Sequence, residues 1–372
     1  MRLNLLTALL GISMSVTSLA AEPFRVYAPS SKTQTLWIVD AVPKADGGLD
    51  LKLAEKRELG FNGRVIAAHP KKPLLYIVGG GERGKVPGAV VTLAKNGTYA
   101  SQQRVALNDD AAYLSLDRTG AFLFGVSYGN GRLNAYRIGE DGLPGKAVAT
   151  IDEGKKEAHC VLISPDNRFL YIPYVKGNLA LLQYRFDATT GTVTPLVPAN
   201  ANPPAGTGPR HLVYHPKLPM VYFSNEQGIG LSTYERRADG QLVLKQDIAI
   251  LPEGMSKNGL SASDLEITPD GKFIFAGLRG HTQDFDRIAR YRVNADGQAE
   301  LLGLTPADKI PWGLALSPDA KHLLVSAYNG ATLTAYRITN EGGLEKAASL
   351  SWDAEISDLL TLAVNRAATT KR

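Results

Sequence analysis

One short phrase recurs six times along the chain, and its spacing restricts the fold more than any other feature. Each copy consists of an apolar run of four or five residues, a polar turn and a second apolar run. The residues that anchor these turns are Pro70, Asp117, Pro165, Pro216, Pro269 and Pro318. Successive anchors are 47, 48, 51, 53 and 49 residues apart. A single period of about 50 residues, built from short strands, is typical of β-propeller blades.

The two ends of the chain supply a seventh unit. Residues 24–27 and 36–39 match the second and third strands of a blade, but no first strand precedes them. Residues 359–364 form an apolar run at the other end, and pairing the two leaves no open sheet edge. We therefore predict an all-β fold, a seven-bladed β-propeller whose closing blade is built from N- and C-terminal strands. A tandem of β-sandwiches would explain neither the single period nor the complementary ends.

Residues 1–21 differ in character from the rest of the chain. Arg2 carries positive charge, an apolar run follows over residues 5–16, and small residues occupy positions 18, 20 and 21. This pattern predicts a secretory signal peptide, and the run is too short for a comfortable membrane span. We expect cleavage after Ala20 or Ala21, a single propeller domain over residues 22–372, and a periplasmic mature protein. No later stretch is apolar enough to insert into a membrane after leader cleavage.

Composition limits the possible partners. The 372 residues carry a net charge of +5, and the 41 Lys and Arg residues are scattered. A nucleic-acid partner is not expected, because no basic patch with interleaved aromatic residues is visible. Cys160 is the only cysteine, so no internal disulfide can form even in an oxidising compartment. It follows His159 in an extended strand, so its side chain should point away from that of His159 and pack as a small buried group.

Propeller geometry predicts which side chains meet. The first strand of each blade starts at one face of the ring and the second strand returns to it, so residues before the first and after the second surround one mouth. The residues six positions before each anchor are Arg64, Ala111, His159, Arg210, Ser263 and Trp312. Those ten positions after each anchor are Gly80, Ser127, Val175, Glu226, Arg279 and Tyr328. A His, an Arg and a Glu that converge on a concave, solvated mouth predict a hydrolytic site at His159, Arg210 and Glu226.

Each of these residues also has a structural interpretation. Arg210 and Glu226 could form an interblade ion pair, and His159 could be a hydrogen-bonded histidine at a strand end. Arg279 and His281 could be solvated loop residues.

Other polar positions suggest no chemistry of their own. His69 and His215 fall in turns on the opposite face and are expected to be structural. No metal site is expected, because calcium sites are built from carboxylate and carbonyl oxygens, whereas the predicted mouth offers mostly cations.

Several segments carry a family resemblance over the whole mature chain. They are Ala158-His159-Cys160 with residues 164–171, residues 206–211 with His215-Pro216, Asn225-Glu226, and residues 278–281. In this combination the chain resembles the seven-bladed lactonase family, which includes propeller-type 6-phosphogluconolactonases and the carboxymuconate-cyclising enzyme of fungi. The resemblance implies that the family's active-site His, Arg and Glu correspond to His159, Arg210 and Glu226. Departures at residues 173–177, 277–278 and 284–286 bear on substrate specificity more than on reaction type.

A lactone is an ester, so its hydrolysis needs an activated water, a donor for the oxyanion and a proton for the ring oxygen. Arg210 suits the oxyanion because its guanidinium is a permanently charged, planar array of donors. Glu226 and His159 would divide the roles of base and acid, with Glu226 as base and His159 as acid in a working assignment. No cofactor is implied. The residues expected to bind substrate hydroxyls are Arg64, Arg279 and His281.

The predicted leader bears on the substrate. A phosphorylated sugar lactone is a cytoplasmic metabolite, whereas glucono-1,5-lactone arises outside the inner membrane, so the resemblance is greatest to exported bacterial gluconolactonases. We therefore expect a periplasmic lactonase with a small-molecule sugar lactone as its partner. The alternatives are a 6-phosphogluconolactonase, a muconate-cyclising enzyme and a non-catalytic periplasmic binding module, because propellers host many functions. The sequence does not determine the oligomeric state.

Overall fold

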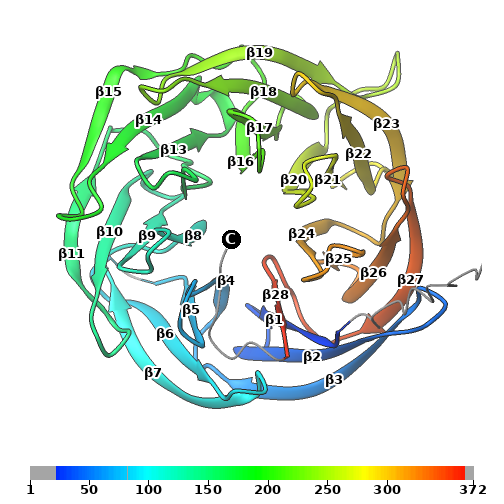
Figure 1. Ribbon diagram of the computed structural model, residues 1–372, viewed down its shortest axis with the longest axis horizontal. Coiled ribbons are helices and arrows are strands. Elements are labelled where there is room, and N and C mark those ends of the chain that lie inside the picture. Colours follow the sequence, from blue (N-terminus) through cyan, green and yellow to red (C-terminus); the bar gives the residue numbers. More distant parts are fainter. Residues whose placement is uncertain (1–21, 82, 365–372) are drawn as a thin grey trace, which may run out of the picture.

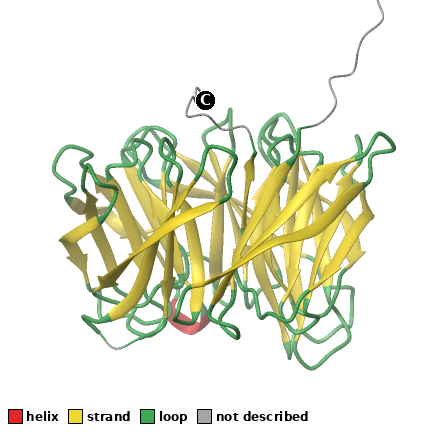
Figure 2. Ribbon diagram, turned by 90° about the horizontal axis from the view of Figure 1, so that it is seen from below, coloured by secondary structure: helices red, strands yellow, loops and turns green. Residues whose placement is uncertain are grey.

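Seven four-stranded antiparallel sheets surround a central axis, which confirms the predicted all-β, seven-bladed propeller (Figure 1). The structure is a computed structural model that describes residues 22–81 and 83–364. The predicted signal peptide over residues 1–21 therefore lies outside the described residues. Seen from the side, the strands run between two faces that carry the connecting loops (Figure 2). Among the described residues, no helix has the length and apolar character needed to cross a membrane.

Each blade is given from its innermost to its outermost strand. Blade 1 contains β28 (Leu360–Ala363), β1 (Phe24–Pro29), β2 (Thr35–Pro43) and β3 (Leu49–Glu58). Blade 2 contains β4 (Gly63–Ala68), β5 (Leu74–Gly79), β6 (Val86–Leu93) and β7 (Tyr99–Leu107). Blade 3 contains β8 (Tyr113–Leu116), β9 (Phe122–Val126), β10 (Leu133–Ile138) and β11 (Pro144–Ile151).

The second half of the chain repeats this order. Blade 4 contains β12 (Leu162–Ile163), β13 (Phe169–Tyr174), the 3₁₀ turn η1 (Lys176–Asn178), β14 (Ala180–Phe186) and β15 (Val193–Asn200). Blade 5 contains β16 (Pro209–Tyr214), β17 (Met220–Asn225), β18 (Gly230–Arg236) and β19 (Leu242–Ala249). Blade 6 contains β20 (Leu260–Ile267), β21 (Phe273–Gly280), β22 (Arg287–Val293) and β23 (Ala299–Pro306). Blade 7 contains β24 (Pro311–Leu316), β25 (His322–Ala327), β26 (Thr332–Ile338) and β27 (Leu344–Ser351).

The closing blade joins the chain ends as predicted. Strand β28 pairs antiparallel with β1, with Phe24 opposite Ala363 and Tyr27 opposite Leu360. The inner strand of blade 1 thus comes from the C-terminal end and its other three strands from the N-terminal end. The inner strands β4 and β24 of the flanking blades both contact β28, so the ring has no open edge at this point.

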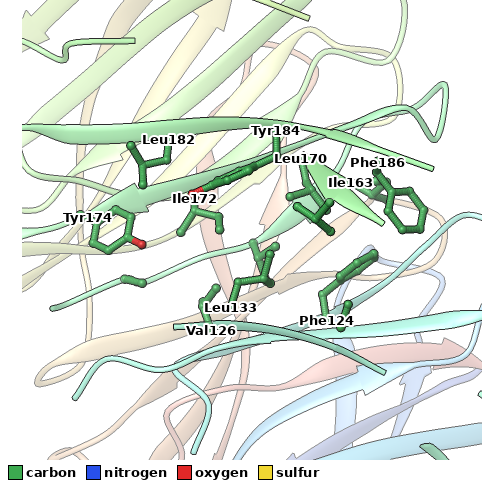
Figure 3. Close-up of a cluster of buried hydrophobic side chains, with 14 of the residues drawn as sticks. Phe124, Val126, Leu133, Ile163, Leu170, Ile172, Tyr174, Leu182, Tyr184 and Phe186 are labelled. Atoms are coloured by element: carbon green, nitrogen blue, oxygen red, sulfur yellow. The ribbon is translucent and has the colours of Figure 1, made fainter. Parts of the chain in front are cut away.

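Apolar packing between neighbouring blades forms the core. The second strands are covered on both faces and are apolar almost throughout, as in β5 and β9, whereas the outermost strands alternate between half-buried and exposed residues. Between blades 3 and 4, Phe124 meets Phe186 edge to face with ring centroids 5.1 Å apart (Figure 3). Truncating such a buried aromatic residue to Ala costs about 3–5 kcal/mol, so each blade depends on its neighbour.

Tyrosines of the second strands add directional links between blades. Each donates its hydroxyl to a glycine carbonyl in the outer hairpin of the next blade. The pairs are Tyr27 to Gly97, Tyr76 to Gly142, Tyr171 to Gly240 and Tyr222 to Gly297. Distances of 2.6–2.9 Å show that these buried hydroxyls are satisfied, so these tyrosines are part of the scaffold.

The turns between first and second strands lie on the face opposite the mouth. In blade 3, the position of this turn differs by one residue from the prediction. Backbone hydrogen bonds show that Asp117 occupies the same place as His69 and Ser164 in their turns. Its carboxylate accepts the N–H groups of Thr119 and Phe122, as the other turn residues do with their own polar atoms. The predicted anchor in blade 3 was therefore wrong by one residue, because an Asp that caps the turn was aligned with the prolines that follow the cap.

Candidate active site

A cavity of about 550 Å³ opens at the mouth, within the range of small-molecule sites. We call it the mouth cavity. All seven blades contribute lining residues, which come from the inner two strands of each blade and the loops beside them. The polar and aromatic residues that line it include Arg64, Tyr113, Tyr128, His159, Arg210, His211, Glu226, Arg279, His281, Trp312, Tyr328 and Asp358.

Irregular pairing at the mouth explains why consecutive residues can face the cavity. The pairing of the first two strands shifts by one residue between Pro209 and Leu212, and again between Ala262 and Leu265. Similar shifts occur at the start of β4 and β24. An extra residue in one strand bends it and re-aims the side chains beside it. Arg210 and His211 both line the cavity, although regular alternation would send them to opposite sides.

The three residues predicted to be catalytic converge, together with Arg279, which was predicted to bind substrate. Arg210 Nε lies 3.2 Å from Glu226 Oε2, and Arg279 Nη2 lies 3.8 Å from Glu226 Oε1. His159 Nε2 is 4.0 Å from Glu226 Oε2, which is beyond hydrogen-bond distance. Arg210 and Glu226 both belong to blade 5, whereas Arg279 reaches the same carboxylate from blade 6. Glu226 therefore has a guanidinium group on each side.

The prediction of a solvated mouth was wrong for the arginines. The side chains of Arg210 and Arg279 are only 1% and 4% exposed, against 13% and 15% for His159 and Glu226. Arg210 is the largest of the fully buried side chains. Arg279 was also considered as a solvated loop residue, but it lies within β21 and donates to the Ala262 carbonyl at 2.8 Å. Removing one member of such a buried pair typically costs about 3–5 kcal/mol.

Several buried polar atoms at this cavity have no aligned hydrogen bond among the described residues. They are His159 Nδ1, Arg210 Nε and Nη1, His211 Nε2, Glu226 Oε2 and Arg279 Nε. The Arg210–Glu226 contact is thus close enough for an ion pair but is not directed as a hydrogen bond. Each unmet buried group costs about 1–3 kcal/mol, so a cluster of them around a cavity is a strong indication of ligand binding.

Burial and the arginine charges set the protonation states. Burial, then repulsion by Arg210, holds the pKa of His159 well below 6.5, so the imidazole is neutral at neutral pH. The same two causes lower the pKa of His211. Burial and the neighbouring Arg210 lower the pKa of Arg279 to about 9, so this guanidinium still carries its charge at neutral pH. Two neutral imidazoles therefore lie beside the two arginine cations and Glu226.

The end of β21 is held firmly in place. Asp286 Oδ1 accepts the N–H groups of Gly280 at 3.0 Å and Ile310 at 2.8 Å. A Cβ on Gly280 would clash with the Gln283 carbonyl oxygen, so this close loop requires glycine. The guanidinium of Arg279 also lies 4.5 Å from the centroid of the Trp312 ring. The loop over residues 284–286, one of the segments that depart from the family pattern, thus positions an arginine of the site.

The remaining predicted rim residues are at the cavity but apart from the central cluster. Arg64 is exposed at the cavity edge and makes no ion pair within the described part of the chain. His281 is exposed, and its Nε2 lies 2.7 Å from the Ser261 hydroxyl. In blade 3, the corrected register brings Tyr128 to the cavity in place of Ser127. The other ring positions that do not line it are Gly80, Val175 and Ser263.

The sequence analysis assigned no role to a group of acids and a second histidine. His211 Nδ1 lies 2.7 Å from Asp264 Oδ1, and Asp358 also lines the cavity. Asp264 and Asp358 correct the expectation that the mouth holds mostly cations. Burial, with the charge of Asp264, raises the pKa of Asp358 to about 8. Among the described residues, no three His, Cys, Asp or Glu side chains are grouped so as to hold a metal ion.

Cys160 faces away from the cavity, in agreement with the sequence analysis. It is fully buried and packs with Phe169, Tyr171 and Leu212 between blades 4 and 5. Burial raises the pKa of its thiol, which makes the reactive thiolate scarce. The structure therefore offers no nucleophilic pair between His159 and Cys160.

Comparison of the sequence with known proteins finds matches over most of its length. The family described as lactonase, 7-bladed β-propeller, matches residues 46–352. A 6-phosphogluconolactonase of Klebsiella pneumoniae (strain 342) is 30% identical over 325 residues, which cover 86% of this chain and 92% of the relative. Another, from Cronobacter sakazakii, is 32% identical over 253 residues, covering 68% of this chain and 73% of the relative.

Solved structures share the architecture at lower identity. The periplasmic gluconolactonase of Pseudomonas aeruginosa superposes with a TM-score of 0.78 at 20% identity, covering 92% of this chain and 99% of the other. A protein from Lactobacillus plantarum gives a TM-score of 0.77 at 18% identity, with coverages of 92% and 99%. At these identities the likeness establishes the fold.

Proposed function

The chain belongs to the family of seven-bladed β-propeller lactonases, and we propose that it hydrolyses a non-phosphorylated sugar lactone, such as glucono-1,5-lactone, in the periplasm. Family membership and the curated relatives make it a hydrolase that acts on lactone esters. The observation that carries the proposal is the convergence of Arg210, Arg279, Glu226 and His159 on one cavity. The predicted leader and the likeness to a periplasmic gluconolactonase support the location and the uncharged substrate.

Arg210 stabilises the oxyanion in this proposal. Its Nε and Nη1 hydrogens are buried, charged and without aligned partners, so they can meet the oxygen on which negative charge develops. Donors fixed in place before the reaction act strongly in a site from which water is excluded. Glu226 lies between the two guanidinium groups, 3.2 Å from Arg210 and 3.8 Å from Arg279, and offsets their positive charge.

His159 serves the leaving group. Because its pKa is held well below 6.5, the ring is neutral at neutral pH and carries one N–H. We assign this N–H as the hydrogen-bond donor to the departing ring oxygen, so His159 stabilises that oxygen without having to transfer the proton itself. We no longer assign Glu226 as the base, because its two carboxylate oxygens face the two arginines.

A second candidate substrate is 6-phosphogluconolactone. The curated relatives carry the name 6-phosphogluconolactonase, and one feature of the cavity fits a phosphate. Arg64 lies exposed at the cavity edge, within the described residues it has no carboxylate partner, and its carbonyl accepts the Ser357 hydroxyl at 3.0 Å. An arginine without a counter-charge binds phosphate through charge-assisted hydrogen bonds.

A paired assay separates the two substrates. Purified mature protein and the Arg64→Gln variant would be given glucono-1,5-lactone and its 6-phosphate, with spontaneous hydrolysis subtracted. We expect kcat/KM to be higher for the unphosphorylated lactone and Arg64→Gln to change that value by less than about threefold, because an uncharged substrate offers Arg64 no counter-charge and glutamine can still donate a hydrogen bond. A preference for the phosphate that Arg64→Gln lowers by about tenfold or more would identify the second candidate instead.

Two further measurements bear on the proposal as a whole. N-terminal sequencing of the periplasmic fraction should give Ala21 or Glu22 as the first residue, and an intact N-terminus in the cytosol would overturn the location. No hydrolysis of any lactone in a panel of ring sizes would overturn the lactonase assignment. In that event, a muconate substrate in the same assay would test the cyclising activity.

A further inference from the structure

His211 and Asp264 form a hydrogen-bonded pair at the mouth cavity. His211 Nδ1 and Asp264 Oδ1 are 2.7 Å apart, and the two side chains are 12% and 14% exposed. Asp264 also accepts the Leu265 N–H at 2.8 Å on the same oxygen and the Leu314 N–H at 2.9 Å on the other. The carboxylate is therefore anchored to two blades and cannot turn away from the imidazole.

This pairing decides which nitrogen of His211 can accept a proton. An ionised carboxylate only accepts hydrogen bonds, so Nδ1 carries the hydrogen that it donates to Asp264. Burial alone would raise the pKa of Asp264, but His211 and the backbone N–H groups outweigh it and keep the carboxyl ionised. The free lone pair is then on Nε2, which is buried and has no partner among the described residues. His211 thus presents an acceptor nitrogen at the cavity.

His159 provides an internal comparison. The two rings are 5.2 Å apart, but no carboxylate lies within hydrogen-bond distance of His159. Its nearest acid, Glu226, is 4.0 Å away and faces two arginines. A carboxylate that is hydrogen-bonded to Nδ1 fixes the tautomer and stabilises the imidazolium that forms when Nε2 takes a proton. Of the two histidines, only His211 has such a carboxylate.

We propose that His211, oriented by Asp264, is the general base of the lactonase reaction, an inference that rests on the proposed function. Nε2 takes one proton from a water molecule while the water oxygen bonds to the lactone carbonyl carbon and the carbonyl electron pair moves to the oxygen near Arg210. When the carbonyl re-forms, the bond between that carbon and the ring oxygen breaks. The His211 imidazolium returns its proton to the ring oxygen, so one water is consumed and the histidine ends neutral.

Several charged or titratable groups face this pair and would shape its pH dependence. They are Tyr113, His159, Cys160, Arg210, Glu266, Arg279 and Asp358, from blades 1, 3, 4, 5 and 6, while blade 7 contributes the Leu314 N–H. Arg210 and Arg279 lower the pKa of His211, whereas the charge of Asp264 raises it. Asp264 is a positioning residue, since it acts on the substrate only through His211.

Two variants test the base. His211→Gln should lower kcat by about 100- to 10,000-fold, the usual contribution of a general base. Asp264→Asn keeps the imidazole but removes the charge that raises its pKa. The low-pH fall of kcat/KM should therefore move to lower pH by about one unit or more. A purely structural role of Asp264 would lower the folded fraction without moving this limb.

His215→Asn is the matched control, because His215 also accepts backbone N–H groups but lies in a turn on the opposite face. Its kcat and pH profile should equal those of the wild type. The inference is overturned if the wild type is active while His211→Gln keeps kcat within about threefold. The inference is also overturned if the low-pH fall of kcat/KM does not move in Asp264→Asn. This second measurement keeps the inference testable if His211→Gln fails to fold.

A readout without substrate separates failure of this inference from failure of the proposed function. In protein labelled with ¹⁵N-histidine, the His211 signals should show a protonated Nδ1 and a bare Nε2 at neutral pH, and Asp264→Asn should lower the pH at which they change. If the wild type hydrolyses no lactone, the proposed function fails even when these signals are as expected. A protonated Nε2 with a bare Nδ1 overturns the inference whatever the activity.

Discussion

The two faces of the propeller treat the same residue type in opposite ways. On the face opposite the mouth, His69 and His215 each accept two backbone N–H groups of their own turn on Nδ1, at 2.9–3.0 Å. At the mouth, His159 Nδ1 and His211 Nε2 are buried without a partner among the described residues. Residue type alone therefore does not distinguish the two faces, whereas the satisfaction of ring nitrogens distinguishes these four histidines. His322, at the start of β25 on the opposite face, is an exception, because its Nε2 lies 3.0 Å from the Gly47 carbonyl oxygen but its buried Nδ1 has no partner among the described residues.

The contrast extends beyond histidine. Within the described part of the chain, six of the fourteen unpartnered buried polar atoms belong to five residues around the mouth cavity. The opposite-face turns use the hydroxyls of Ser164 and Ser317, and the carboxylate of Asp117, to cap neighbouring N–H groups. Unmet polar groups cost stability, so their concentration at one end indicates a site that a ligand completes. We therefore expect the mouth to be the functional end of the molecule and the opposite face to be scaffold.

The largest effect is expected from Arg210→Lys. Lysine keeps the positive charge beside Glu226 but loses the planar array of donors, so the oxyanion loses its best partner. We expect kcat to fall about 100- to 1,000-fold, equivalent to about 2.7–4 kcal/mol. The measurement is kcat per folded molecule, with the folded fraction taken from near-UV circular dichroism. An unchanged kcat with a lower melting temperature would make Arg210 a structural ion-pair residue.

His215→Ala should show the opposite pattern. It removes an acceptor for the Lys217 and Leu218 N–H groups and a side chain that packs against Gly271 of blade 6. These two hydrogen bonds lie at a partly exposed turn and are worth about 0.5–1.5 kcal/mol each, so losing them lowers the melting temperature by several degrees. Activity per folded molecule should be that of the wild type, by calorimetry and assay on one preparation. A loss of kcat in this variant would break the division between the two faces.

The overall ring and the meeting of the trio could be predicted from the sequence because both follow from the repeat. A constant period fixes the blade number, and the apolar runs at the two ends fix the closure through β1 and β28. Counting from the turn anchors then brings His159, Arg210 and Glu226 to one mouth. These inferences need only the order of strands, which local apolar patterns reveal.

The rest depends on one-residue irregularities that carry no clear sequence signal. The bulge between Pro209 and Leu212 turns His211 toward the cavity beside Arg210, which strict alternation forbids. Asp117 takes the place of the capping His or Ser in its turn, one residue before the position that proline holds in the other blades. Counting ten residues from Asp117 therefore gave Ser127 instead of Tyr128. Asp264 occupies the same strand position in blade 6 as His211 in blade 5, five residues before the anchor proline. That coincidence could have suggested the pair.

The stability of the Asp358→Asn variant relative to the wild type should increase as the pH rises. Burial and the charge of Asp264 raise the pKa of Asp358 from 3.8 to about 8 in the folded state. Between about pH 4 and pH 8 the unfolded chain loses the Asp358 proton while the folded protein keeps it. The free energy of unfolding of the wild type therefore falls as the pH rises through this range. Asn cannot titrate and can still accept the Ile66 N–H that Asp358 binds at 2.9 Å.

The gap in unfolding free energy between Asp358→Asn and the wild type should thus widen with pH, by at most about 1.4 kcal/mol per unit. Denaturant unfolding at pH 5, 6.5 and 8 measures it. A gap that stays constant or narrows would show that Asp358 is ionised in the fold.

The smallest effect is expected from His281→Gln, which tests whether unsatisfied atoms, rather than position at the mouth, mark the reacting residues. His281 lines the same cavity, but it is exposed and its Nε2 is already paired with the Ser261 hydroxyl at 2.7 Å. A single hydrogen bond to a substrate hydroxyl is worth about 0.5–1.5 kcal/mol, so KM should rise about two- to tenfold. Because that contact would be made equally in the ground and transition states, kcat should not change. Steady-state kinetics on glucono-1,5-lactone distinguish the two parameters, with Arg210→Lys as the reference for a kcat effect. If His281→Gln instead lowers kcat as strongly as Arg210→Lys does, a satisfied residue takes part in the reaction, and hydrogen-bond satisfaction cannot be used to separate the chemistry of this mouth from its scaffold.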